Sequence, residues 1–169
     1  MDFEKLAALR YSARKFKDTP VEREKIMKIL EVGRLAPTAR NLQSQRIIAA
    51  LSPEALEKVY KSYHCFSAPA VLIVCGDRDA ACNTPITERN MSEMDASIVA
   101  THMMMEVYEL GLGCTWVCAF NSEILKKEFE LPDNIVPYML LPIGYPADDC
   151  VPSERHFQRF PLDHTVKFM

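Results

Sequence analysis

The chain has 169 residues, of which 49% are hydrophobic and 25% charged, and this length suits one domain over residues 1–169. The net charge is −3, with 20 Lys and Arg against 23 Asp and Glu, so no overall basic field exists to attract nucleic acid. Five glycines stand against eleven prolines, and neither G-x-G-x-x-G nor G-x-x-x-x-G-K-[ST] can be written anywhere. A ligand phosphate would therefore have to be held by side chains.

The cysteines and the N-terminal residues indicate the cellular compartment in which the protein is expected. The six cysteines include no C-x-x-C pair, and the opening residues MDFEKLAALRYSARKF lack the apolar run of a signal peptide. We therefore expect reduced thiols in a cytoplasmic protein. The most apolar stretch, residues 94–113, contains Asp95, Glu106 and Glu109, so it fits a buried helix better than a membrane span. His102 and the methionines after it are expected to pack there, with no metal site.

The first half of the chain alternates helical and extended patterns. Residues 2–9 are good helix formers, and the helical period is then lost before Pro20. Apolar residues at helical spacing predict an amphipathic helix over 21–35. Residues 46–51 predict a strand, and the Ser-Pro pair that follows predicts the start of a helix over 53–60.

The second half continues this alternation. The β-branched run at 68–77 predicts a strand that is buried on both faces. Residues 78–92 are polar and aperiodic, so we expect a loop, and whether it covers a site stays open. The later elements are expected, in order, as a helix, a strand, a helix and a strand over 92–110, 114–120, 122–130 and 137–145. Ser122 is the expected N-cap of the second of these helices.

The order of elements indicates the fold class. Interleaved helices and strands without repeats predict a single three-layer α+β domain, with a small central mixed or antiparallel sheet flanked by helices. The tail from Pro146 onwards is punctuated by proline and needs a surface on which to lie.

Arg10, Ser12 and Arg14 form the first candidate site. If the segment RYSAR is extended, residues two apart share a face at about 6.6 Å, so two guanidinium groups and a hydroxyl form one row. Such a row suits an elongated anionic ligand. Spacing alone does not decide this, because most Arg and Ser residues are simply exposed.

The loop after the second predicted helix is the other candidate site. It reads APTARNLQ over residues 36–43, and the amides of Asn41 and Gln43 offer donors and acceptors to the edge of a flat heterocycle. Taken alone, the loop could equally be a plain connection, because loops favour these residue types.

Together these two segments resemble motifs of the FMN-dependent nitroreductase family. Its members open with R-x-S-x-R and carry A-P-S-A-x-N-x-Q after the next helix, where this chain has RYSAR and APTARNLQ. The resemblance continues through MDASIVA, GLGCTWVCAFN and LLPIGYPAD, and it closes with R-x-P-L-[ED]-x-x-V, here RFPLDHTV. It spans nearly the whole chain, and the joint order of the motifs is more specific than any one of them.

The resemblance implies an FMN site built from two subunits. Arg10, Ser12 and Arg14 would contact the phosphate, ribityl chain and pyrimidine edge. Arg159 would add a cation at the phosphate, with Arg155 as a weaker candidate. The partner subunit would contribute the loop residues Pro37, Thr38, Ala39, Asn41 and Gln43. The isoalloxazine ring would lie along the backbone of Cys118, Ala119 and Phe120.

The chain also departs from the family pattern. Ser44 and Gln45 stand where the family often has Pro-Trp, Thr38 replaces Ser, and Asn121 replaces a frequent Asp. These changes bear on the pocket above the ring, and so on the substrate. The family also includes members that dehalogenate, dehydrogenate or fragment the flavin, so nitro reduction is a family label and not a deduced reaction.

Our hypothesis from the sequence is a cytoplasmic, homodimeric FMN oxidoreductase. NAD(P)H would deliver hydride to flavin N5, and a nitroaromatic, quinone or similar small-molecule acceptor would then bind the same face in a ping-pong cycle. Arg14 would stabilise the negative charge of reduced flavin, and no side-chain acid is required. The resemblance also favours a C-terminal segment that crosses to the partner. Neither nucleic acid nor a membrane is an expected partner.

Two other hypotheses remain. The first is an FMN-binding protein without turnover that acts as a flavin sensor, a store or the partner of another enzyme. The second is an α+β interaction domain that binds no ligand. The colour of the purified protein and acceptor-dependent oxidation of NAD(P)H distinguish the three.

Overall fold

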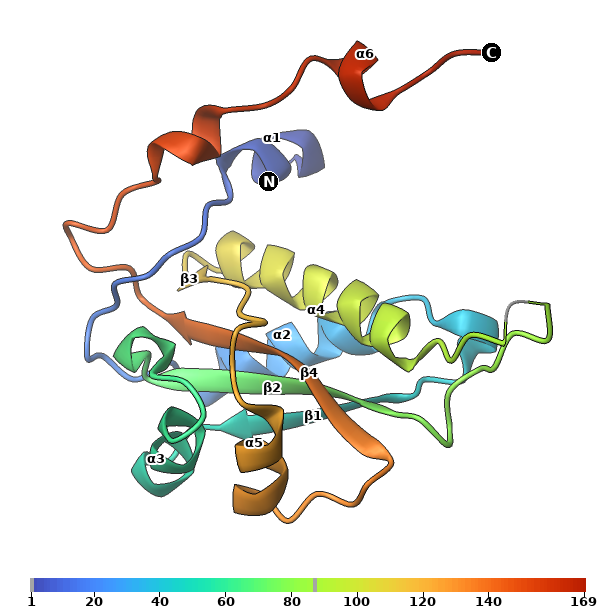
Figure 1. Cartoon of the computed structure of the whole chain (residues 1–169). Coiled ribbons are helices and arrows are strands. Elements are labelled where there is room, and N and C mark those ends of the chain that lie inside the picture. Colours follow the sequence, from blue (N-terminus) through green and yellow to red (C-terminus); the bar gives the residue numbers. More distant parts are fainter. Residues whose placement is uncertain (1, 87) are drawn as a thin grey trace.

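A four-stranded antiparallel sheet in the order β1-β2-β4-β3 organises the chain (Figure 1). The computed structural model describes residues 2–86 and 88–169. The strands are β1 (Gln45–Ala50), β2 (Ala70–Asp77), β3 (Gly113–Cys114) and β4 (Ile135–Gly144). The helices are α1 (Phe3–Leu9), α2 (Arg23–Leu35), α3 (Pro53–Tyr60), α4 (Ser92–Glu109), α5 (Ser122–Glu128) and α6 (Leu162–Thr165). Short 3₁₀ turns are η1 (Ala39–Asn41), η2 (Cys65–Ser67) and η3 (Glu154–Phe157).

Helices cover both faces of the sheet, which gives three layers. Alternate residues of β2 point to opposite faces, so Leu72 and Val74 join the core beneath α2 and α4. Ile73 and Cys75 join the core shared with α3 and α5. Figure 1 shows the two pairs of helices on either side of the sheet. The expected three-layer α+β fold is confirmed, with a fully antiparallel sheet, and β2 is buried on both faces as its apolar run predicts.

Pro142 interrupts the strand that the sequence predicts over residues 114–120. Only the two residues of β3 pair with β4, and Val117 then makes an isolated bridge to Leu140. Val117 and Leu140 each donate the backbone N–H to the carbonyl of the other residue. An N–H at position 142, two residues further along β4, would therefore point toward the segment that contains Val117. Pro142 has no N–H to donate, which breaks the ladder between these two contacts. The strand predicted over 114–120 is therefore wrong after Cys114, except for the single bridge at Val117.

Two helices have N-cap side chains of the expected type, but one of these caps lies a residue earlier than predicted. Ser52 caps α3 by accepting a hydrogen bond from the Ala55 N–H at 3.2 Å, as the Ser-Pro pair predicts. Asn121, not Ser122, is the N-cap of α5, and its side-chain oxygen accepts from two backbone N–H groups of the first turn, both at 3.1 Å. Asn and Ser are equally good N-caps, so local preference does not separate these neighbours.

Helix α4 runs along one face of the sheet and packs against it. It has 18 residues, and Gly111 follows it with a positive φ of 74°. His102 is half-buried on this helix and its Nδ1 lies 2.9 Å from the Ile98 carbonyl. Within residues 2–86 and 88–169, no group of three potential ligands could hold a metal ion, and no helix is long and apolar enough to cross a membrane.

The extended segment after α1 lies between β3 and the chain that leaves β4. Ser12 pairs with Cys114 in parallel, and the Ala13 N–H donates to the Cys114 carbonyl at 2.9 Å. A few residues later, the Lys17 N–H donates to the Tyr145 carbonyl at 2.8 Å. The beginning and the end of the chain are thus held side by side.

Replacing Gly113 by alanine tests how closely these segments pack. A Cβ at Gly113 would lie 2.7 Å from the Cβ of Ala13 and 2.9 Å from Cγ of Pro146, which are rigid neighbours. We expect Gly113→Ala to lower the free energy of unfolding by about 1–3 kcal/mol, measured by urea denaturation.

Gly33→Ala is the matched control for this substitution. A Cβ at Gly33 would meet the buried but flexible side chain of Met103, and alanine is favoured over glycine by about 1 kcal/mol inside a helix such as α2. The loss of stability should therefore be smaller. An equal loss in both variants would contradict the tight approach at Gly113.

Candidate active site

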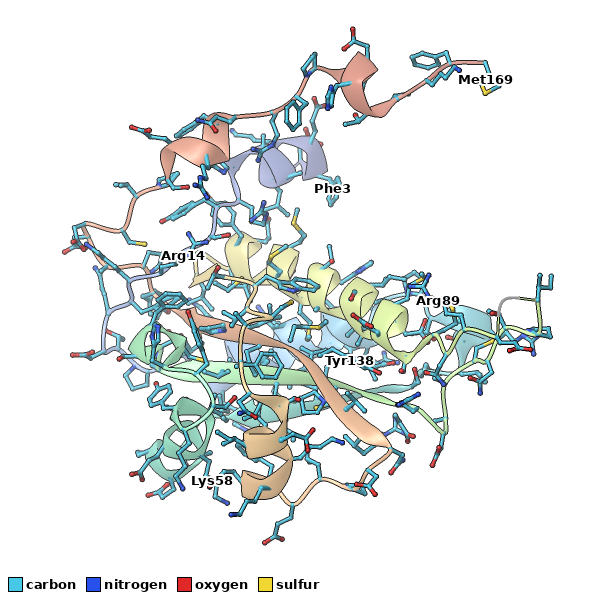
Figure 2. All side chains as sticks on the ribbon, viewed as in Figure 1. Phe3, Arg14, Lys58, Arg89, Tyr138 and Met169 are labelled. Carbon is cyan, nitrogen blue, oxygen red and sulfur yellow. The ribbon has the colours of Figure 1, made fainter. Side chains whose placement is uncertain are left out.

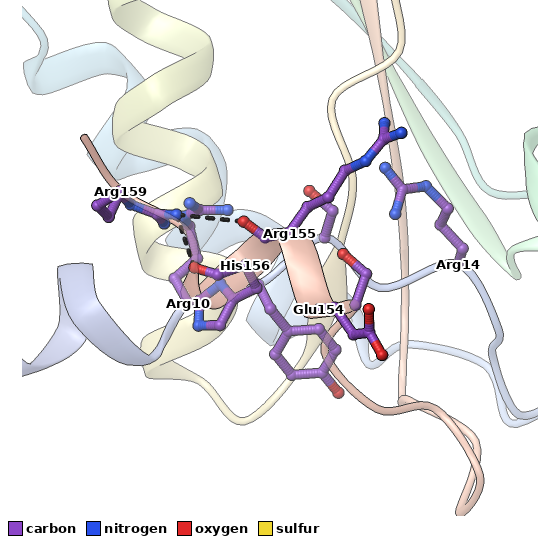
Figure 3. A pocket seen from close by; sticks show the side chains of 9 residues that line it. Arg10, Arg14, Glu154, Arg155, His156 and Arg159 are labelled. Atoms are coloured by element: carbon purple, nitrogen blue, oxygen red, sulfur yellow. Dashed lines mark hydrogen bonds between the residues drawn. The ribbon is translucent and has the colours of Figure 1, made fainter.

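The arginines that the sequence singles out meet in one cleft of about 630 Å³. Its lining comes from the segment after α1 and from η3 with its flanking residues (Figure 3). Figure 3 shows Arg14 and Arg155 reaching toward the same part of the cleft from different segments. The lining residues are Arg10, Tyr11, Ser12, Arg14, Ser153, Glu154, Arg155, His156 and Arg159. The structure thus brings together predicted site residues from both ends of the chain.

Pairing with β3 determines which way the side chains of the row Arg10, Ser12 and Arg14 point. Ala13 is fully buried beside β3, so the alternation of an extended chain turns its neighbours Ser12 and Arg14 away from the core. Arg10 lies on the same side and lines the same cleft. The expected row of two guanidinium groups and a hydroxyl is therefore found.

Tyr11 holds the C-terminal segment against this row. Its hydroxyl donates to the Cys150 carbonyl at 3.0 Å. Its ring lies edge-on to the rings of Tyr108 and His156, with centroids 6.2 and 6.5 Å away. The sequence motif gave no signal for Tyr11, because its contacts depend on the path of a segment far along the chain.

The lining of the cleft carries more positive than negative charge. Glu154 contributes the one carboxylate of its lining. In the part of the chain that the structure describes, Arg10, Arg14 and Arg155 form no ion pair with a carboxylate. Guanidinium groups of like charge repel one another unless an anion lies between them, and their planar donors match the oxygens of a phosphate. The cleft is therefore suited to an oxyanion.

Arg159 lies in the cleft but has backbone partners. Its Nη1 donates to the carbonyl of His156 at 2.6 Å and, more weakly, to that of Arg155 at 3.5 Å (Figure 3). It also donates to the Gln158 carbonyl at 2.8 Å. A guanidinium has five N–H donors, so others remain for a ligand. Among residues 2–86 and 88–169, the side chain of Arg155 makes no such backbone bonds, and it points into the cleft beside Arg14.

The second candidate segment forms η1 and its flanks, between α2 and β1. Arg40, Asn41 and Gln43 have positive φ angles of 53°, 55° and 51°, a left-handed conformation that non-glycine residues rarely adopt. The Gln43 N–H donates to Oγ1 of Thr38 at 3.0 Å, which closes the turn. The side chains of Asn41 and Gln43 are exposed. Strain of this kind gathers at functional sites.

This loop and the arginine cleft lie at opposite ends of α4. The Ala39 N–H donates to Asp95, in the first turn of the helix, at 2.8 Å. Ser12 instead pairs beyond the last turn. The 18 residues of α4 span about 27 Å. Figure 2 shows the same separation between Arg14 and Arg89, which precedes α4. Within one chain, the loop does not line the cleft.

Residues 118–120 connect β3 to α5. Cys118 and Ala119 are exposed, while Phe120 packs against the core beneath α3 and α5. The indole N–H of Trp116 donates to Sγ of Cys118 at 3.0 Å. Because β3 pairs with Ser12, this segment starts beside the arginine row of the same subunit.

Comparison with known proteins identifies the family. A profile of the nitroreductase family matches residues 7–66 and 56–145, which is most of the chain. The chain belongs to the nitroreductase family.

Related proteins agree with this assignment. A solved structure of a nitroreductase family protein from Clostridium difficile 630 is 41% identical, with a TM-score of 0.94 over 99% of this chain and 98% of that one. A structure from Parabacteroides distasonis is 25% identical, with a TM-score of 0.83 over 99% and 98%. A relative from Methanothermobacter thermautotrophicus is 28% identical over 159 residues, covering 88% of this chain and 80% of its own. The last two carry the provisional name NADH dehydrogenase/NAD(P)H nitroreductase, and together these matches support an oxidoreductase.

The tyrosine that holds the cleft together predicts a sensitivity to alkaline pH. Burial raises the pKa of Tyr11 from 10.0 to about 12. The native state therefore keeps this proton at pH values where the unfolded chain has lost it, and stability present below pH 10 falls as the pH rises toward 12. Burial raises the pKa of Cys65, Cys75 and Cys114 to about 12 as well, with the same sign.

We expect the free energy of unfolding, measured in urea across this range, to fall with rising pH. Tyr11→Phe should make the fall shallower and cost about 1 kcal/mol at neutral pH through the lost bond to Cys150. A variant with the pH dependence and the neutral stability of the wild type would contradict this role of Tyr11.

Proposed function

We propose that this member of the nitroreductase family is an FMN-dependent NAD(P)H oxidoreductase. It would act as a homodimer and reduce nitroaromatic compounds, quinones or similar acceptors, with residues 1–169 forming one flavin-binding domain. The observation that carries the proposal is the cleft in which Arg10, Arg14, Arg155 and Arg159 converge without ion pairs to carboxylates in the described residues.

The cleft suits the phosphate end of FMN. The chain has no glycine-rich loop, so backbone N–H groups of such a loop are not there to hold a phosphate. Guanidinium groups from both chain ends offer the alternative, and Ser12 adds a hydroxyl for the ribityl chain or the pyrimidine edge. When bound, FMN would take reducing equivalents from NAD(P)H and pass them to the acceptor.

The residues of this chain would bind and orient the cofactor. Arg14 is exposed at the open side of the row, where its fixed charge would stabilise negative charge on the reduced pyrimidine ring. The backbone of Cys118, Ala119 and Phe120 would lie along the ring, since this segment continues from β3 beside Ser12. No side-chain acid is assigned to the reaction.

A second copy of the chain would complete each site. Pro37, Thr38, Ala39, Asn41 and Gln43 lie at the far end of α4 from the cleft, so we assign them to the flavin of the partner.

Apolar side chains left exposed on α1 and α2 support docking of this second copy. Phe3 is 69% exposed, Met27 55% and Leu35 67%. A groove of about 410 Å³ lies between α1, α2 and α4, and one of about 630 Å³ lies between α2 and α4. Val32 and Glu106 line both. The tail from residue 159 onwards is exposed throughout and stands away from the sheet (Figure 1), so it could reach a partner.

The absorption spectrum and turnover of the purified protein test this function. We expect a yellow dimer by size-exclusion light scattering, and oxidation of NAD(P)H that depends on menadione or nitrofurazone. A colourless protein that takes up no added FMN would contradict both flavin hypotheses. Bound FMN without acceptor-dependent oxidation would favour a flavin-binding protein without turnover.

Arg14→Ala tests the electrostatic role of the row. Loss of a charge-assisted hydrogen bond should weaken FMN binding by roughly 10- to 100-fold, and the midpoint potential of the bound flavin should fall with the lost cation. Flavin fluorescence titration and redox titration measure the two effects. Lys61→Ala is the control, because Lys61 pairs with Glu128 between α3 and α5, away from the cleft and from the grooves, and should change neither value. Unchanged affinity and potential in Arg14→Ala would remove Arg14 from the site.

A further inference from the structure

The side chain of Asp95 is a buried carboxylate that joins the loop of residues 38–44 to α4. Asp95 is 1% exposed and lies in the first turn of the helix. Its Oδ1 accepts the Ala39 N–H at 2.8 Å, and its Oδ2 accepts the hydroxyl of the fully buried Ser44 at 3.1 Å. One carboxylate therefore holds the two ends of the loop.

The residues between these two attachments need such support. Arg40, Asn41 and Gln43 all have left-handed backbone angles, and non-glycine residues keep this conformation only where their surroundings impose it. The hydrogen bonds inside the loop, such as the one from the Gln43 N–H to Oγ1 of Thr38, close the turn but do not attach it to the rest of the molecule. The two bonds to Asp95 attach the loop to α4.

Ser44 is the residue that lets the carboxylate hold both ends. The motif that this loop resembles often has proline at that place, and proline has no hydroxyl to donate. The Ser44 carbonyl also accepts the Asp77 N–H at 2.8 Å, so the same residue connects the loop to the end of β2. The backbone is thereby fixed while the side chains of Asn41 and Gln43 remain exposed.

We propose that Asp95 is a positioning residue for flavin binding. Through Ala39 and Ser44 it holds the strained loop in the one conformation that presents the amides of Asn41 and Gln43 to the flavin of the partner subunit. This inference rests on the proposed FMN function. Asp95 itself is buried and contacts the loop, not the ligand.

Four variants separate positioning from simple stability. Asp95→Ala removes both bonds, and Ser44→Ala removes one. Asp95→Asn should preserve them, because the amide oxygen can accept from the Ala39 N–H while its NH₂ donates to the Ser44 hydroxyl. Ser92→Ala is the matched control, since Ser92 is equally buried in the same turn of α4 but bonds to the Tyr138 hydroxyl at 2.7 Å.

The two measurements are FMN affinity in the dimer and amide hydrogen exchange of the loop without added flavin. Asp95→Ala should bind FMN at least about tenfold more weakly and exchange faster at Ala39 and Gln43, because the loop is released. Ser44→Ala should shift both values in the same direction by a few-fold, and Asp95→Asn should stay near the wild type. Ser92→Ala should lower Tm and leave both values unchanged.

The outcomes separate this inference from the proposed function. If wild-type protein binds FMN and Asp95→Ala binds it equally well, the inference is overturned and the FMN function stands. If Asp95→Ala does not fold, Ser44→Ala decides: weaker binding with faster loop exchange supports the inference, and unchanged binding overturns it. Wild-type protein that binds no FMN would overturn the proposed function and the inference with it.

Discussion

The parallel contact between Ser12 and Cys114 at the sheet edge is the constraint on which the arginine cleft depends. It holds the start of the chain against β3, and the chain that leaves β4 then runs back along the same segment. Gly113 permits the approach, because the space where its side chain would lie is taken by Ala13. The hydrogen bond from the Tyr11 hydroxyl to the carbonyl of Cys150, 139 residues away in the sequence, then holds the segment that leads to η3 against the start of the chain. Charged residues from both chain ends thereby become neighbours.

Backbone bonds and packing, more than ion pairs, hold these chain ends together. The pairs Lys15–Asp149 and Lys17–Asp148 join the same segments, but their side chains are 45% to 93% exposed. Exposed pairs contribute only about 0–1 kcal/mol each. A backbone hydrogen bond contributes about 0.5–1.5 kcal/mol, and several of these accompany the full burial of Ala13. Added salt should therefore weaken the binding of an anion in the cleft, but it should change the shape of the cleft little.

The sequence predicts the elements whose patterns are local and misses those that depend on distant partners. The apolar run at 68–77 predicts a buried strand because its central β-branched and apolar residues carry the signal locally. The similar run at 114–120 fails because Pro142, on the neighbouring strand, withholds the N–H that would continue the ladder. The spacing of the arginine row suggests a site and the family resemblance selects it. Tyr11 and Asp95 are missed, because the contacts that define them lie with segments far along the chain. The family motifs name the residues at the proposed site and leave open what holds them there.

Helix α4 accounts for the separation of the two candidate segments, and so for the second chain that the proposed site requires. A helix cannot shorten without losing its hydrogen bonds, so the attachment of the loop at Asp95 stays about 21 Å from Glu109, at the end of the helix that lies near the arginine row. A ligand touched by both must therefore lie between one chain's cleft and another chain's loop. The same helix supplies His102 and Glu106 to the exposed grooves on which we place the second copy. Because one rigid helix carries both the proposed docking face and the attachment of the loop, docking of a second copy on α4 would also determine where the loop of that copy meets the proposed flavin site.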